Sequence, residues 1–160
     1  MVWNCKMLDV VGTKNVTYDP PLDHIVGETV LVLADGREIN QRSLFPGDMF
    51  YMPKGTTPKG WPWYLAKEGH LSDYYRANNS HRQPLFLMLP GKHLFLVDGK
   101  CWNQQLGRYG GWHVRGEAPN ISVFPSIDIS GTYHGCLSNG VLGDDVVHRR
   151  YDVNGNIIGH

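Results

Sequence analysis

The chain has 160 residues, of which 41% are hydrophobic and 19% charged, and its 15 Lys and Arg balance its 15 Asp and Glu. Without net charge it has no field to hold a nucleic-acid backbone or an anionic membrane, which argues against both partners. No run approaches the ~18 apolar residues of a membrane span, and three scattered cysteines do not make a disulfide framework, so we expect a folded protein in a reducing cytoplasm or in an assembly built there.

The 19 Gly and 10 Pro of the whole chain favour short strands joined by tight turns, beginning in the N-terminal half. The strands predicted there are 25–33, 38–45 and 49–52. Asp35-Gly36 is a hairpin signal between the first two. We expect the third, a short apolar run, to be buried on both faces or covered by the segment that follows it. That segment, 54–62, is rich in Pro and Gly and is predicted to be a loop leading to an aromatic cluster.

One helix is predicted at 71–79, where Ser72 is a capping residue and Gly and Pro are absent. The strands predicted after it are 84–89, 93–98, 112–115, 120–124, 132–137 and 141–142. We expect the first two, which are antiparallel partners, to be central strands. The Asn154-Gly155 turn predicts a hairpin at the C-terminus.

We therefore expect one domain over residues 1–160, with an N-terminal hairpin region (1–45), a core (46–145) and a C-terminal hairpin (146–160). Its fold class is mainly β (α+β), an antiparallel sandwich or half-open barrel of short strands and hairpins with one short helix.

A nucleophilic site is predicted around Ser126, which follows Pro125 at the end of a strand, with His113 and His134 on the flanking strands. A serine hydroxyl needs a base to attack a carbonyl, and an imidazole oriented by a carboxylate is such a base. The candidate carboxylates are Asp128, Asp98 and Asp145. The candidate backbone N–H donors to an oxyanion are those of Gly131 and Gly135.

A metal site is the alternative for some of the same residues. His134 and Cys136 are two apart, so on a strand both side chains point to one face, and His113 or Cys101 would complete a zinc ligand set. The serine site needs no cofactor and leaves Cys136 as packing. A third interpretation is structural, because a serine at a strand end often bonds its own backbone and a strand cysteine is often a small buried hydrophobe.

A block of sequence around these residues matches a family pattern. It contains Gly-Trp-His-Val at 111–114, Pro-Asn-Ile at 119–121, Pro-Ser-Ile at 125–127 and Tyr-His-Gly at 133–135. Segments 46–50 and 84–90 fit the same pattern upstream. In these residues the chain resembles a bacterial and phage family of unknown function whose phage members are often mislabelled ammonia monooxygenase, and the resemblance covers roughly 46–145.

The resemblance implies two different functions. Bacterial members accompany ubiquitin-like conjugation operons, which implies a serine-type peptidase or hydrolase that acts in the cytoplasm on a ubiquitin-like or other protein tail, with Ser126 and His113 or His134 in the site. Phage members imply instead a virion-associated or accessory protein, a structural or interaction module without catalysis that binds a protein assembly or its own copies. The monooxygenase label has no support, because no membrane span or copper site is present.

Overall fold

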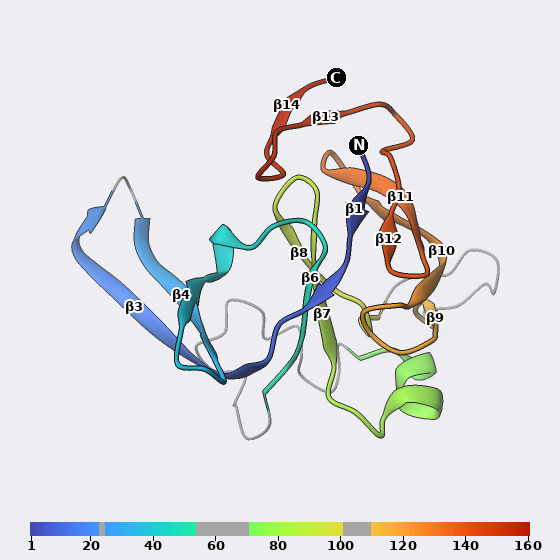
Figure 1. Ribbon diagram of the computed structural model, residues 1–160, viewed down its shortest axis with the longest axis horizontal. Coiled ribbons are helices and arrows are strands. Elements are labelled where there is room, and N and C mark those ends of the chain that lie inside the picture. Colours follow the sequence, from blue (N-terminus) through green and yellow to red (C-terminus); the bar gives the residue numbers. More distant parts are fainter. Residues whose placement is uncertain (23–24, 54–70, 101–109) are drawn as a thin grey trace.

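The computed structural model describes residues 1–22, 25–53, 71–100 and 110–160 (Figure 1). Its N-terminal elements are β1 (Trp3–Asn4), β2 (Lys6–Met7), β3 (Val10–Leu22), β4 (Ile25–Leu33), β5 (Glu38–Asn40), the 3-10 turn η1 (Gln41–Ser43) and β6 (Asp48–Tyr51). Its later elements are the π-helical turn η4 (Tyr75–Asn79), β7 (Leu85–Leu89), β8 (His93–Leu96), β9 (His113–Arg115), β10 (Ser122–Ile129), β11 (Tyr133–Ser138), β12 (Val141–Leu142), β13 (Arg150–Tyr151) and β14 (Ile157–Gly159). The mainly β class is confirmed.

The strands form four sheets. Their orders are β1-β12-β11-β10-β9, β2-β6-β7-β8, β3-β4-β5 and β13-β14, and the described strands do not close into a barrel. The pairs are antiparallel apart from β2 with β6, which is parallel. β1 lies at the edge of the five-stranded sheet beside β12, so the N-terminal strand joins a sheet made mostly from the C-terminal third of the chain (Figure 1).

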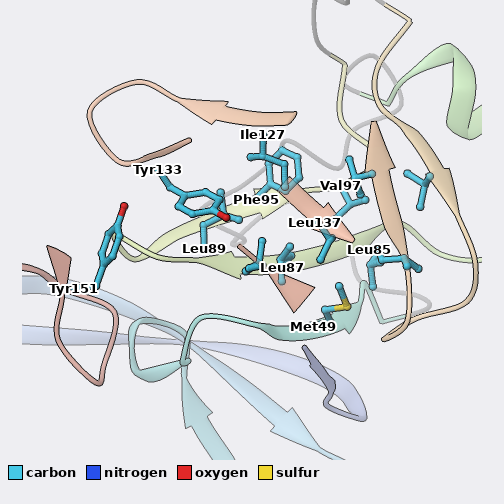
Figure 2. Packing of buried hydrophobic residues seen from close by; sticks show 14 residues of the cluster. Met49, Leu85, Leu87, Leu89, Phe95, Val97, Ile127, Tyr133, Leu137 and Tyr151 are labelled. Atoms are coloured by element: carbon cyan, nitrogen blue, oxygen red, sulfur yellow. The ribbon is translucent and has the colours of Figure 1, made fainter. Parts of the chain in front are cut away.

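The four-stranded sheet is the middle layer of the molecule. Leu85, Leu87 and Leu89 of β7 pack in a cluster shared with the five-stranded sheet (Figure 2). Phe86 and Met88 of β7 pack in a second cluster, shared with β3 and β4. Because successive strand residues point to opposite faces, a strand that is apolar at every position is covered on both sides. The burial expected of 49–52 is confirmed at Met49 and Phe50, whereas Tyr51 and Met52 are partly exposed. The central position is confirmed for β7, but β8, which was also expected to be central, lies at the edge of the described sheet.

The N-terminal hairpin differs from its prediction in two respects. The Asp35-Gly36 turn is present, but the second strand, β5, ends at Asn40. Asn40 accepts a hydrogen bond from the Arg42 backbone N–H and begins η1, so the chain turns before 45. The sequence also concealed β3, a long partner of β4, because polar residues and Pro20 interrupt its apolar alternation.

The segment predicted as a helix is confirmed in part. Ser72 Oγ accepts a hydrogen bond from the Tyr75 N–H at 3.0 Å, which is the expected N-terminal cap. The turns that follow are π-helical over Tyr75–Asn79. The aromatic residues 61–64 lie outside the described residues. The C-terminal hairpin predicted at Asn154-Gly155 is confirmed by the pairing of β13 with β14.

Candidate functional site

Ser126 lies inside β10 and not after it, which corrects the prediction. Val123 pairs with Leu137 and Ile127 with Gly135, so the three residues 124–126 of β10 face the single residue Cys136 of β11. Pro125 has no N–H to give to the ladder, and a bulge accommodates such a residue. Bulges redirect side chains and are common beside active sites. This one sets the direction of the Ser126 side chain.

Ser126, Asp128 and His134 project from one face of the five-stranded sheet, the face away from the four-stranded sheet, which we call the outer face. Ile127 is fully buried on the opposite, inner face, and strand alternation places its two neighbours on the outer one. Asp128 and His134 are direct partners across the β10–β11 ladder. Directly paired residues have Cβ atoms about 5 Å apart, so the side chains of this pair can interact.

The three side chains form a line of hydroxyl, imidazole and carboxylate. Ser126 Oγ lies 3.1 Å from His134 Nε2, and His134 Nδ1 lies 3.9 Å from Asp128 Oδ2. The two neighbours therefore meet different ring nitrogens, so the imidazole can accept the serine proton while its other nitrogen faces a negative charge. The second distance exceeds that of a hydrogen bond, and the Asp128 side chain is 65% exposed, so Asp128 lies near the ring without a hydrogen bond to it.

A second carboxylate holds the backbone of the same histidine. Asp145 Oδ1 accepts hydrogen bonds from the His134 N–H and from Arg149 Nη1, both at 2.8 Å. Asp145 Oδ2 accepts the Arg149 backbone N–H, also at 2.8 Å. Burial favours a raised pKa for Asp145, but the Arg149 and His134 hydrogen bonds and the guanidinium charge outweigh it and lower that pKa. The segment 145–149 thus fixes β11 at His134.

The remaining candidates from the sequence have other partners. Asp98 forms a bidentate ion pair with Arg82. It also accepts a hydrogen bond from the backbone N–H of Leu85 in the four-stranded sheet. His113 pairs with Phe124 across the β9–β10 ladder, and its ring stacks on Tyr74 with the centroids 4.5 Å apart. His134, rather than His113, is therefore the imidazole that contacts Ser126.

Those alternative zinc ligands that the structure describes do not converge. Cys136 is exposed two residues from His134, but His113 stacks elsewhere. Over 1–22, 25–53, 71–100 and 110–160, no three His, Cys, Asp or Glu side chains gather as a metal site. Cys101 lies outside these ranges. The Cys5 thiol is no alternative nucleophile, because burial raises its pKa to about 12.

Glycine and arginine residues complete the surroundings of the site. Gly131, with φ of +73°, lies in the turn between β10 and β11. Gly135 lies under the Tyr133 ring, where a Cβ would clash with the tyrosine hydroxyl, so this glycine is required for packing. Sequence reasoning missed Arg149 as the partner of Asp145, because a spacing of four residues predicts a contact in a helix and 145–149 is a turn.

Comparison of the chain with protein-family models, with curated proteins and with solved structures finds no match. The family resemblance therefore stays a prediction. Within the part of the chain that the structure describes, no helix is long and apolar enough to cross a membrane.

Proposed function

We propose that the chain is a serine-type hydrolase in which Ser126 is the nucleophile, His134 the general base and Asp128 the charge that favours the protonated imidazole. The observation that carries this proposal is the 3.1 Å contact between Ser126 Oγ and His134 Nε2. A serine with a purely local role bonds its own or a neighbouring backbone group. Ser126 instead contacts a ring nitrogen from the neighbouring strand.

The chemistry follows the usual order for such a pair. Ser126 Oγ attacks the carbonyl carbon of an ester or amide, and His134 Nε2 takes the hydroxyl proton. The imidazolium then gives this proton to the leaving group as the carbon–heteroatom bond breaks. Water, deprotonated by the same imidazole, then attacks the acyl carbon, and the imidazolium returns the proton to Ser126 Oγ as the bond between Oγ and the acyl carbon breaks. The Asp128 carboxylate stabilises the imidazolium in both halves of the reaction, because it lies 3.9 Å from Nδ1.

The substrate class that fits best is the tail of a protein. Ser126 and His134 are partly exposed on a sheet face, and an extended segment can lie along the strands there. This agrees with the ubiquitin-like or other protein tail that the family resemblance implies.

Labelling with a fluorophosphonate tests the proposal, because this reagent forms a bond with an activated serine. We expect one adduct per chain on Ser126, located by peptide mass spectrometry. Ser126→Ala should abolish the adduct, and His134→Gln should slow its formation by ~100-fold, within the range of general-base effects. Ser130→Ala, an exposed serine in the next turn, is the matched control and should label normally. Equal labelling rates in His134→Gln and the native chain would contradict the proposal.

The second candidate is an interaction protein without catalysis, such as a virion-associated module. The observation that favours it is exposed apolar surface at the C-terminal hairpin, where Val153 is 74% and Ile158 60% exposed. Clusters of exposed apolar residues often mark protein contacts. The same labelling experiment separates the two candidates, because an interaction module has no reason to activate Ser126.

A further inference from the structure

A pocket of about 400 Å³ lies along β9, β10 and β11, and its lining includes Phe124, two residues before Ser126. Its lining comes from three strands: His113 and Arg115 of β9, 122–124 of β10, and 137–138 of β11. Phe124 lines the pocket and also begins the bulge that carries Ser126. Two residues of chain span no more than about 7 Å, so the pocket adjoins the serine.

The charge in this pocket has one sign. No acidic side chain is among its lining residues. Arg115 is exposed and pairs across the ladder with Ser122, and among the described ion pairs none includes it. A guanidinium has donors arranged to bind a carboxylate through two hydrogen bonds. Arg115 is therefore available in this pocket to bind a carboxylate.

The second property of the pocket is an aromatic surface. Phe124 is 52% exposed, which is high for a phenylalanine on a strand. The His113 ring lies in the facing ladder position and is held in place by stacking on Tyr74. Exposed rings of this kind bind apolar or aromatic side chains.

Another pocket among the described residues, of about 510 Å³, has a different character. It lies near the chain termini and is lined by Asp144 and Asp145 together with Arg149 and Arg150. Asp145 and Arg149 already bind each other, so much of its charge is internally compensated. It offers no comparable excess of one sign near Ser126.

We infer that the pocket beside Ser126 is a substrate subsite that takes an extended peptide, with a carboxylate on Arg115 and an apolar side chain against Phe124. This inference rests on the proposed hydrolase function and names its substrate class. Ser122, the ladder partner of Arg115, is four residues from Ser126, at most about 14 Å of chain. The carboxylate therefore lies within about four peptide residues of the bond that Ser126 attacks. It comes from an Asp or Glu side chain or from a C-terminus.

Peptide binding to the Ser126→Ala chain, followed by NMR of its backbone amides, tests the inference without turnover. The probes are three alanine hexapeptides, each with one Phe. Two are capped at both ends and carry either Glu or Gln three residues from the Phe. The third carries neither Glu nor Gln but has a free C-terminal carboxylate. We expect at least one of the two carboxylate peptides, with Glu or with the free C-terminus, to shift the NMR signals of the backbone amides of 113–115 and 122–126. That peptide should bind at least ~10-fold tighter than the Gln peptide. The preferred peptide identifies the source of the carboxylate.

Adding Arg115→Ala should reduce the tighter binding to the level of the Gln peptide. Arg37→Ala, an exposed arginine in the hairpin between β4 and β5, is the matched control and should leave it unchanged. Equal affinity of all three peptides, or tight binding that survives Arg115→Ala, would overturn the subsite. If this occurs while fluorophosphonate still labels Ser126, only the subsite is wrong. Carboxylate-dependent binding without Ser126 labelling would instead overturn the hydrolase and leave a peptide-binding pocket.

Discussion

On its inner face the five-stranded sheet packs Ile127, Tyr133 and Leu137 against the four-stranded sheet, and each of these side chains is at most 1% exposed. On its outer face the same two strands, β10 and β11, carry Ser126, Asp128 and His134 in contact with solvent. Ile127 lies between Ser126 and Asp128 in sequence but on the other face. One residue of sequence therefore separates a packing position from a chemical one.

The difference between the faces separates two kinds of substitution. Inner-face residues determine whether the strands form at all, because removal of buried atoms leaves a cavity that the packed layers cannot fill. Outer-face residues contribute few packing contacts, so their loss should alter reactivity and leave the fold in place. The predictions below test this separation.

The largest effect is expected from Ile127→Ala. Ile127 is fully buried in the cluster shown in Figure 2, and truncation of such a residue costs about 3 kcal/mol of the free energy of unfolding. Ser126→Ala, at the adjacent position, should cost less than ~1 kcal/mol. Urea unfolding followed by tryptophan fluorescence measures both variants. A loss for Ser126→Ala as large as that for Ile127→Ala would mean that the two faces are not independent.

The sequence predicted that an imidazole from a flanking strand, His113 or His134, lies near Ser126, because both histidines are close to it in sequence. It did not distinguish His134 from His113 or Asp128 from Asp145 and Asp98. Those choices depend on the ladder register, and the bulge at 124–126 shifts that register without a reliable signal beyond Pro125. Long-range partners were also concealed, since β3 lacks apolar alternation and β1 joins β12 across most of the chain.

Asp145→Asn tests how much a buried carboxylate that bonds the backbone of His134, an outer-face residue, stabilises the fold. Asp145 is buried and bonds Arg149 and the backbone of His134, so loss of its charge should cost about 2–3 kcal/mol of the free energy of unfolding. The pKa of Asp145 is lowered in the folded state. Its charge therefore stabilises the fold above the unfolded pKa of about 4, and this contribution is lost as the pH falls through the folded value.

The measurement is urea unfolding of the native chain and of Asp145→Asn at pH 7 and at successively lower pH. The stability difference between the two should be constant near neutral pH and should shrink below about pH 4. Asp144→Asn, at the adjacent and exposed position, is the control and should change stability little. A difference between native chain and Asp145→Asn that grows as the pH falls would contradict the lowered pKa.

The smallest effect is expected from Asp128→Asn, which removes an outer-face charge and keeps the side-chain shape. The Asp128 carboxylate lies 3.9 Å from His134 Nδ1 and is 65% exposed. Because solvent weakens this interaction, Asp128→Asn should slow fluorophosphonate labelling of Ser126 by only about 5-fold. The effect should shrink further in 1 M salt, where the Debye length is ~3 Å, whereas the His134→Gln defect should persist. A loss for Asp128→Asn as large as that for His134→Gln would show that the carboxylate bonds Nδ1 directly when Ser126 reacts.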